Sequence, residues 1–519
     1  MLNRLLFASL STIITFSALL VIGLFTATKV DAQIVRPNVV TFLIDDLDVN
    51  LFNKLVSDGY MPNVKNYILD PGTSFTNSFV SVSLCCPSRA TFLTGQYSHN
   101  HGVLGNVSPT GGVTKLDDTN TLATWLHDND YFVGHIGKYL NGYGVNPNAP
   151  PTSPSNPNYI PPGYDFWQAL ITPYKFYNFQ INANGVQVYY GQDPTDYQTD
   201  VLTGLAGEFI SQSEILNDLQ PFFLMLAPAA PHIEQGSGAP RLTGCTHSTW
   251  AETLNSAPRH IGSLSSLAFT VPDSFNEADM TDKPAYLRDN TYPMTSGDKQ
   301  CAKKQAINRA EALRAVDDMV GSVVNDLSVA GELDNTILVF TSDNGYFHGE
   351  HRLSKKIFAY DEAIRTPLII RAPGFVPGQN SSQLVLNNDY APTIAELTGT
   401  TMGRNVDGRS LVPLLQNPLL ETWRKRFLVE FLGTVGKELP NPIPNFSAVR
   451  TGVTDPQMPN RMYAEWDDSS LEYYDLATDP NQLQSNHADP QFVEPIAILK
   501  NYLTNLRTCA DGTCQSFED

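Results

Sequence analysis

Basic residues are scarce in this sequence. Its 519 residues include 33 Lys and Arg against 53 Asp and Glu, which gives a formal net charge of −20. Nucleic-acid-binding proteins need a basic surface for the phosphate backbone, so this acidity excludes nucleic acid as a partner. Internal repeats and heptads are also absent. With 42% apolar residues the chain is too hydrophobic to stay disordered, and its length predicts one large globular domain with a smaller one.

Long apolar runs are missing everywhere except at the N-terminus. There, Arg4 precedes an apolar run that extends to about Thr28 and is followed by Val30-Asp31-Ala32. This pattern predicts a signal peptide over residues 1–32, and the alternative is an uncleaved membrane anchor. We therefore expect a secreted, cell-wall, periplasmic or lysosome-like location, without stable membrane association after cleavage. Sequons at Asn106, Asn380 and Asn445 are candidates for glycosylation on this route.

Cysteines are few, and their spacing divides them into two kinds. Four are expected to form two disulfides typical of a secreted protein, Cys245 with Cys301 and Cys509 with Cys514. Cys85 and Cys86 remain. A bond between neighbouring cysteines is strained, and no second Cys or His pair stands at zinc-ligand spacing. We therefore expect a different role for one of these two residues.

Apolar strand-like runs alternate with amphipathic helices, which is typical of a sheet covered by helices on both faces. The strongest helix pattern extends from about Ala306 to Ala330 and ends at Gly331, and a shorter helix is expected from about Thr121 to Asp128. The expected strands are Val39 to Ile44, Tyr131 to Ile136, Phe222 to Leu226 and Ile337 to Thr341.

Polar residues follow the C-terminal end of each expected strand. Ligands bind at that edge of open α/β sheets, so we expect these side chains to lie together. Each residue alone has an ordinary explanation as a turn or surface residue, and only their joint placement indicates a site. The residues are Asp45, Asp46, Lys138, His232, Asp343 and Asn344.

The chemistry of these residues indicates a metal and an anion. Three carboxylates and an amide oxygen suit a hard cation such as Ca²⁺ or Mg²⁺ and suit zinc poorly. Arg89, Lys138 and Lys356, together with His232, would surround an anion bound to that metal. An oxyanion ester is the natural substrate of such a site, because metal and cations stabilise the charge that develops during group transfer.

The stretch CCPSRATFLTG at residues 85–95 resembles the type I sulfatase signature CxPSRxxxLTG, whose first cysteine is converted to Cα-formylglycine. The resemblance extends from about Pro37 to Asp479-Pro480 and is closest to arylsulfatases and N-acetylglucosamine-6-sulfatases. Further blocks that look like family motifs are Asp45-Asp46, Gly137-Lys138, Pro231-His232, Asp343-Asn344-Gly345, Lys356 with Tyr360, and Asp389-Tyr-Ala-Pro392.

The resemblance implies an alkaline-phosphatase-like α/β fold, with a large, mixed but mostly parallel sheet sandwiched by helices. It also implies a smaller C-terminal α+β domain with an antiparallel sheet. We place the catalytic domain at residues 33–417 and the C-terminal subdomain at residues 418–519. The loop-rich regions Tyr143 to Trp167 and Ile233 to Ala302 are candidates for substrate selection.

The resemblance also implies roles for the site residues. Cys85 would become formylglycine through a formylglycine-generating enzyme, and its aldehyde hydrate would attack the sulfur of a small sulfate ester. Sulfate and an alcohol or phenol would be released, from an aryl sulfate or from a 6-sulfated N-acetylglucosamine. Asp45, Asp46, Asp343 and Asn344 would bind one Ca²⁺ facing Cys85. Arg89 and Lys138 would orient the hydrate, Lys356 and His232 would bind sulfate, either of them would protonate the leaving oxygen, and Asp343 would be the base.

One departure from the family pattern concerns the lysine motif. Many sulfatases have a His two positions after the Lys, whereas this sequence has Leu140 there. Asn141 and His348 are the two candidates to take the place of that His.

Two other functions compete with the sulfatase interpretation. A phosphodiesterase or phosphonate monoester hydrolase of the same superfamily would use a similar metal and nucleophile. An inactive binder of sulfated glycans is the alternative from another class. The complete motif set argues against the inactive binder, because such a protein has no reason to keep Cys85, Arg89, Lys138 and Asp343 together.

Overall fold

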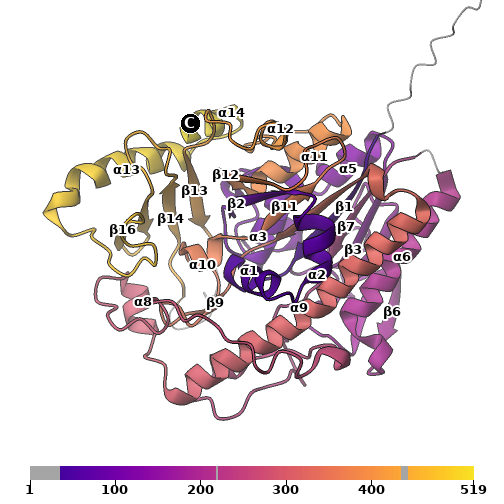
Figure 1. Cartoon of the computed structure of the whole chain (residues 1–519), viewed down its shortest axis with the longest axis horizontal. Coiled ribbons are helices and arrows are strands. Elements are labelled where there is room, and N and C mark those ends of the chain that lie inside the picture. Colours follow the sequence, from indigo (N-terminus) through magenta and orange to yellow (C-terminus); the bar gives the residue numbers. More distant parts are fainter. Residues whose placement is uncertain (1–35, 218–219, 434–441) are drawn as a thin grey trace, which may run out of the picture. The chain divides into compact units, whose positions relative to one another are not determined.

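The computed structural model describes residues 36–217, 220–433 and 442–519, so the predicted signal peptide lies outside the described residues. A ten-stranded sheet organises this part of the chain (Figure 1). In spatial order its strands are β12 (Gln379–Leu386), β2 (Thr73–Phe79), β11 (Leu368–Arg371), β8 (Thr336–Ser342), β1 (Asn38–Ile44), β7 (Phe222–Ala227), β3 (Phe132–Gly137), β4 (Phe166–Leu170), β5 (Phe179–Ala183) and β6 (Val186–Tyr190).

The centre of the sheet is parallel. β1 pairs in parallel with β7 and β8, and β3 pairs in parallel with β7 and β4. β11 is antiparallel to both of its neighbours, and β4, β5 and β6 form an antiparallel edge. The sheet is therefore mixed but mostly parallel, which confirms the expected fold class. Buried on both sides, the central strands consist of nearly continuous apolar residues.

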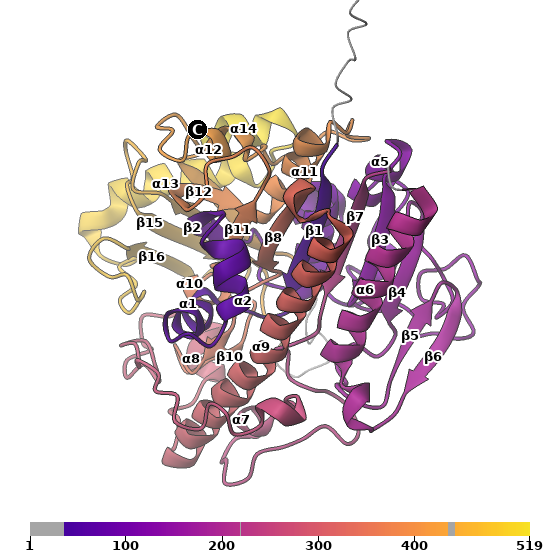
Figure 2. The same cartoon turned by 45° about the vertical axis from the view of Figure 1, so that its right-hand side comes forward.

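Helices cover both faces of this sheet. Alternate residues of β1 belong to different apolar clusters: Val40 and Phe42 lie in one, and Val39 and Leu43 lie in the other. The first cluster includes residues of α1 (Val49–Ser57), α6 (Gln198–Asn217) and α9 (Ser296–Ala330), and Figure 2 shows α6 and α9 running side by side along the sheet. The second includes residues of α3 (Cys85–Thr94), α5 (Leu122–Asp128) and α11 (Tyr390–Thr398).

Helix α9 begins at Ser296, ten residues before the predicted start at Ala306. Its first three turns carry many polar residues, so the apolar periodicity that predicts the rest of the helix is absent there. A capping box starts the helix instead, with the Thr295 side chain accepting from the backbone of Asp298 and the Asp298 side chain accepting in return. The C-terminal end is as predicted, because Gly331 adopts the left-handed conformation.

A second sheet lies in the C-terminal part of the chain. Its four antiparallel strands are β13 (Arg426–Phe431), β14 (Phe446–Thr451), β15 (Arg461–Trp466) and β16 (Leu471–Asp475). Leu499 and Leu503 of α13 (Val493–Leu506) pack in the same apolar cluster as Phe427 and Val449 of the sheet. α14 (Gly512–Glu518) follows. Shorter elements that matter below are α4 (Ser98–His101), β9 (Phe347–His348) and β10 (Ser354–Lys355).

Both expected disulfides are present. Cys245 bonds to Cys301 and Cys509 bonds to Cys514, while Cys85 and Cys86 are free and buried. Across the described residues, no helix is both long and apolar enough to span a bilayer.

The three sequon asparagines have different surroundings. Asn380 is exposed, and Asn445 donates to Asp467. Asn106 is half-buried, and its amide oxygen accepts from the backbone nitrogen of Cys86 at 2.9 Å. Glycosylation of all three stays a prediction.

A buried ion pair between α4 and β13 predicts a specific pH dependence of stability. His99 Nδ1 lies 3.0 Å from Glu430 Oε2. Burial lowers the pKa of His99, but the contacts with Glu430 outweigh burial and raise this pKa to about 9. Because this pKa exceeds that of an unfolded histidine, the stabilisation is complete below about pH 6.5 and is lost as pH rises through about 9. At acid pH the same pair acts through Glu430. Burial raises the pKa of Glu430, but the contacts with His99 outweigh burial and lower it. The stabilisation by Glu430 is therefore present above the pKa of an unfolded glutamate and is lost as pH falls through the lowered pKa.

Urea unfolding at several pH values measures this effect. The free energy of unfolding of the wild type is expected to fall by up to ~3 kcal/mol more between pH 6.5 and 9 than that of His99→Asn. His127→Gln, at a half-exposed histidine, is the control and should keep the wild-type dependence. Parallel curves for the wild type and His99→Asn would contradict the prediction.

Candidate functional site

Four neighbouring strands of the sheet end at one edge, and polar side chains follow each of them. Asp45 and Asp46 follow β1, Lys138 follows β3, and Asp343 and Asn344 follow β8. His232 stands a few residues after β7. All six are buried. Because β8, β1, β7 and β3 are adjacent and parallel, their carboxyl ends bring these residues to the same place.

The backbone at two strand ends is adapted to deliver these side chains. Asp46 adopts a left-handed φ of 62°, which aspartate tolerates better than most residues. Gly137 has a φ of 109°, and a Cβ there would lie 2.1 Å from the carbonyl oxygen of Ala227. Glycine at this position therefore allows β3 and β7 to approach closely while Lys138 turns into the site.

Each of the three carboxylates accepts a hydrogen bond within this group of residues. Lys138 Nζ donates to Asp45 Oδ2 at 2.6 Å. Asp46 accepts from the amide of Asn344 at 2.8 Å through Oδ1, and its backbone nitrogen donates to Asp343 Oδ1 at 3.0 Å. Asn344 Oδ1 is buried and has no hydrogen-bond partner among the described residues.

Cys85 is the first residue of α3 and faces this cluster. Its Sγ lies 3.8 Å from Asp45 Oδ1 and 4.0 Å from Asp46 Oδ1, and Lys356 Nζ lies 2.8 Å away. The partial positive charge of a helix N-terminus favours an anion beside Cys85. Burial raises the pKa of the Cys85 thiol to about 11.

Cations surround the same point. Arg89 Nε donates to Asp343 Oδ2 at 2.8 Å, and its Nη1 donates to the carbonyl of Lys138 at 2.7 Å. Its Nη2 is buried without a hydrogen-bond partner among the described residues. Lys356 Nζ contacts Asp46, and His232 Nε2 lies 3.6 Å from Asp46 Oδ2 while its Nδ1 bonds to the carbonyl of Ile233.

Burial and charge act in opposite directions on the ionisable groups. Burial raises the pKa of Asp45 to about 7, although the Lys138 ammonium opposes the shift. Burial likewise disfavours the charged form of Asp46, but Lys356 and the other nearby cationic groups together outweigh this effect and lower the pKa of Asp46. At Asp343, burial also disfavours the charged form, but Arg89, Lys138 and Lys356 together outweigh this effect and lower the pKa. Burial lowers the pKa of His232 to about 3.

The donor set fits a hard divalent cation. Ligand atoms of Asp45, Asp46, Cys85 and His232 lie within 4.8 Å of one another, and Asn344, whose Oδ1 is unpartnered, donates its amide to Asp46. Carboxylate and amide oxygens are the ligands that Ca²⁺ prefers. The three carboxylates and the cations Arg89, Lys138 and Lys356 cancel in formal charge. A divalent cation would therefore leave the site positive, as an anionic substrate requires.

Comparison with known proteins identifies the family. A family model described as Sulfatase matches residues 37–400, and one described as N-sulphoglucosamine sulphohydrolase, C-terminal, matches residues 349–509. The chain belongs to the sulfatase family. It is 32% identical to human N-acetylglucosamine-6-sulfatase over 93% of this chain and 86% of that protein. It is also 32% identical to an arylsulfatase of Volvox carteri, over 90% of this chain and 74% of the relative.

Solved structures support the fold of this sulfatase. One structure, described as a complex with its substrate D-glucosamine-2-N,6-O-disulfate, superposes with a TM-score of 0.72 at 23% identity. The match covers 93% of this chain and 98% of that one. As a member of the sulfatase family, the protein is a sulfuric ester hydrolase.

Tyr174 lies beside the residues of this site, although no sequence pattern indicated it. Its ring stacks on His232 with centroids 4.2 Å apart, and Lys138 Nζ lies 4.9 Å from the ring centroid. Asn141 donates to the Tyr174 hydroxyl at 2.8 Å. Leu140, where many sulfatases have a His, is instead buried in an apolar cluster.

The two candidates for the missing His therefore lie in different surroundings. Asn141 is joined to the site through Tyr174, beside Lys138 and His232. His348 Nε2 instead pairs with Asp48 Oδ2 at 3.0 Å. Of the two, Asn141 is the residue connected to the site around Cys85, through its hydrogen bond to Tyr174.

Arg309 of α9 is the second residue that sequence reasoning missed. Its guanidinium donates to the carbonyl of Pro231 at 3.2 Å and also to that of Asp46, and it stacks over the ring of Tyr346. It thereby joins the segments that carry Asp46 and His232. The available sequence signal was its spacing, because Arg309 stands four residues before Leu313 on the apolar stripe of the helix, where a charged residue is unusual.

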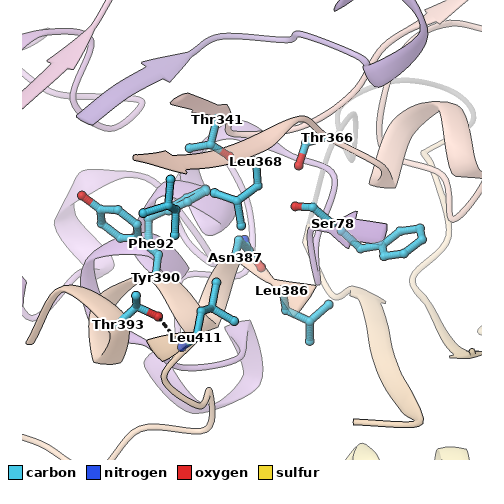
Figure 3. Close-up of a pocket in the computed structure, with 12 residues that line it drawn as sticks. Ser78, Phe92, Thr341, Thr366, Leu368, Leu386, Asn387, Tyr390, Thr393 and Leu411 are labelled. Carbon is cyan, nitrogen blue, oxygen red and sulfur yellow. Dashed lines mark hydrogen bonds between the residues drawn. The ribbon is translucent and has the colours of Figure 1, made fainter. Parts of the chain in front are cut away.

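A small internal cavity lies apart from this site. Figure 3 shows its lining, which includes Ser78, Phe92, Thr341 and Tyr390 and none of the residues around Cys85. Its volume of about 10 Å³ has room for about one water molecule and for no substrate.

Proposed function

We propose that this sulfatase hydrolyses small sulfate esters at the cluster around Cys85, with Cys85 as formylglycine and one Ca²⁺ as cofactors. The observation that carries the proposal is the position of Cys85 at the buried start of α3, against Asp45, Asp46 and Lys356. When present, formylglycine supplies a hydrated aldehyde as nucleophile and Ca²⁺ supplies positive charge that polarises the ester. Asp45, Asp46, Asp343 and Asn344 would hold the metal.

The other residues bind the ester and move protons. Lys138 and Lys356 supply charge to the sulfate oxygens, and Arg89 orients Asp343, the proposed base, through the 2.8 Å bond. His232 and Lys356 are the groups placed to protonate the leaving oxygen. The ring of Tyr174 supports His232 and Lys138 from the side.

The proposed natural substrate is a 6-sulfated N-acetylglucosamine, with aryl sulfates as a further substrate class. The similarity to proteins named N-acetylglucosamine-6-sulfatase and arylsulfatase supports both. A net charge of −20 disfavours long polyanionic chains, so small esters and chain ends are preferred.

The test compares matched esters. We expect kcat/KM for para-nitrophenyl sulfate to exceed that for para-nitrophenyl phosphate, and sulfate release from N-acetylglucosamine 6-sulfate to be detectable. Cys85→Ala serves as the blank. A large preference for phosphate would refute the sulfatase specificity and favour the phosphodiesterase or phosphonate hydrolase alternative, and no turnover of any ester would favour a glycan binder.

The proposed compartment is the secretory pathway, which relatives named extracellular sulfatases support. A formylglycine-generating enzyme there is the proposed partner, acting on Cys85 before the chain buries it. The buried position of Cys85 supports this order.

Removal of the metal should lower both activity and stability. After treatment with a chelator, turnover is expected to fall at least ~100-fold, because the site loses the positive charge that polarises the ester, and Ca²⁺ should restore it. Ca²⁺ at a hundred times its Kd should raise the free energy of unfolding by about 2.7 kcal/mol. Asp45→Asn should lose this gain and the control Asp475→Asn should keep it. An equal gain in both variants would place the ion elsewhere.

A further inference from the structure

Lys356 stands on a segment with an unusual backbone. In residues 349–357, four residues other than glycine adopt left-handed φ angles: His351 at 51°, Arg352 at 59°, Lys355 at 75° and Ile357 at 102°. A β-branched residue such as Ile357 rarely adopts a positive φ. Such conformations cost free energy and persist only where the surroundings hold them. The position of Lys356 therefore depends on what fastens this segment.

The position of Lys356 matters for the site. Its Nζ lies 2.8 Å from Cys85 Sγ and contacts Asp46, and only 8% of the residue is exposed. On its C-terminal side, the backbone nitrogen of Ile357 donates to the carbonyl of Ser83 at 3.1 Å. On its N-terminal side, Ser354 and Lys355 of β10 pair with β9, and the turn between these two strands has a further support outside the hairpin.

That support is the stretch 274–278, which lies in the loop-rich region expected to select the substrate. Two backbone hydrogen bonds join the segments: His351 donates to Ser274 at 2.7 Å, and Asn276 donates to Gly349 at 2.8 Å. An isolated bridge between Phe275 and Glu350 lies between them. The 274–278 stretch thus lies along the start of the lysine segment.

Glu277 makes the side-chain contacts of this support. One carboxylate oxygen, Oε2, lies 2.6 Å from His351 Nδ1, and the other, Oε1, lies 2.9 Å from Lys283 Nζ. Its backbone carbonyl accepts from Arg352 Nε at 2.7 Å. Glu277 therefore bonds to two consecutive residues of left-handed φ. Glu277 and His351 are buried, and the His351 ring also stacks on Tyr360.

We propose that Glu277 is a positioning residue for sulfate ester hydrolysis. It holds residues 349–357 in their strained conformation and so keeps Lys356 against Cys85. Without its carboxylate, His351 and Lys283 lose their buried partner, and the segment relaxes toward ordinary φ angles. This inference rests on the proposed roles of Cys85 and Lys356.

Steady-state kinetics tests the proposal. Glu277→Ala is expected to lower kcat for para-nitrophenyl sulfate about 100-fold and to change KM less than about threefold, since a small displacement of a catalytic group has an effect of this size. Asp455→Ala is the matched control, because it removes a buried carboxylate 2.8 Å from Arg426 in the C-terminal sheet. Its kcat should stay within about twofold of wild type. Equal kcat values for the two variants would overturn the proposal.

A double-mutant cycle shows whether Glu277 acts through Lys356. In a Lys356→Ala background, adding Glu277→Ala should lower kcat less than about threefold, because the group that it positions is gone. A full 100-fold loss in both backgrounds would overturn the proposal. Cys85→Ala separates this outcome from failure of the proposed function: activity in that variant would refute the role of Cys85, whatever Glu277→Ala does.

A second variant covers the case in which Glu277→Ala does not fold. Arg352 is half-buried and donates to the carbonyls of Glu277 and Ala278. Arg352→Ala removes these bonds and is expected to lower kcat about tenfold, again with little change in KM. A wild-type kcat for this variant would overturn the proposal.

Discussion

Replacing Cys85 by alanine is expected to abolish sulfate ester hydrolysis, with a fall in kcat of at least ~10⁴-fold. The loss is this large because the Cys85 side chain is the proposed nucleophile precursor, next to Lys356 and Asp45. The remaining charges can still bind sulfate, so KM should change much less than kcat. Turnover of para-nitrophenyl sulfate and competition by free sulfate measure the two effects separately.

Cys86→Ser is the matched control, because Cys86 is adjacent, equally buried and free. It packs in an apolar cluster behind the site, so serine there should lower stability slightly and keep most of the activity. Peptide mass analysis of the active wild type should find formylglycine at residue 85. An unmodified thiol at this position in fully active enzyme would refute the proposed nucleophile.

The convergence of the site could be predicted from local sequence because it depends on strand ends. Asp45, Lys138 and Asp343 each follow a run of apolar residues, and parallel pairing of such runs leaves few arrangements for their carboxyl ends. The register of β1 with β7 and β8 then determines their distances. The metal and nucleophile roles came from the sulfatase resemblance, which a strand pattern does not contain.

The residues that were missed act across long sequence distances. Tyr174 reaches His232 from a loop between β4 and β5, and Glu277 reaches His351 from another loop. Neither loop has a periodic pattern, so its sequence does not indicate which side chain turns inward. Arg309 lies on a helix whose apolar stripe was recognised, but its polar partners are backbone carbonyls of other segments. Backbone acceptors have no signature in sequence.

Replacing Arg424 by leucine is expected to give the largest loss of stability. Its guanidinium bonds to both carboxylate oxygens of Asp389, at 2.5 and 2.7 Å, and to Glu518 at 2.8 Å. The side chains of all three residues have 0% exposure. The substitution leaves Asp389 buried without its cation and leaves Glu518 with Arg409 at 3.1 Å as its remaining cation, so the free energy of unfolding should fall by about 3–5 kcal/mol. The family-like motif at Asp389 therefore contributes to stability through Arg424.

Urea unfolding, together with kcat measured at a temperature where the variant stays folded, separates stability from catalysis. Arg461→Ala is the control, because its ion pair with Asp475 is one-fifth exposed on each side, and it should cost less than about 1 kcal/mol. Folded Arg424→Leu should keep a kcat close to wild type. Within the described residues, the guanidinium of Arg424 hydrogen-bonds to Asp389, Glu518 and Leu384, and none of these belongs to the cluster around Cys85. A loss below about 1 kcal/mol would show that the buried carboxylates find other partners or protonate at little cost.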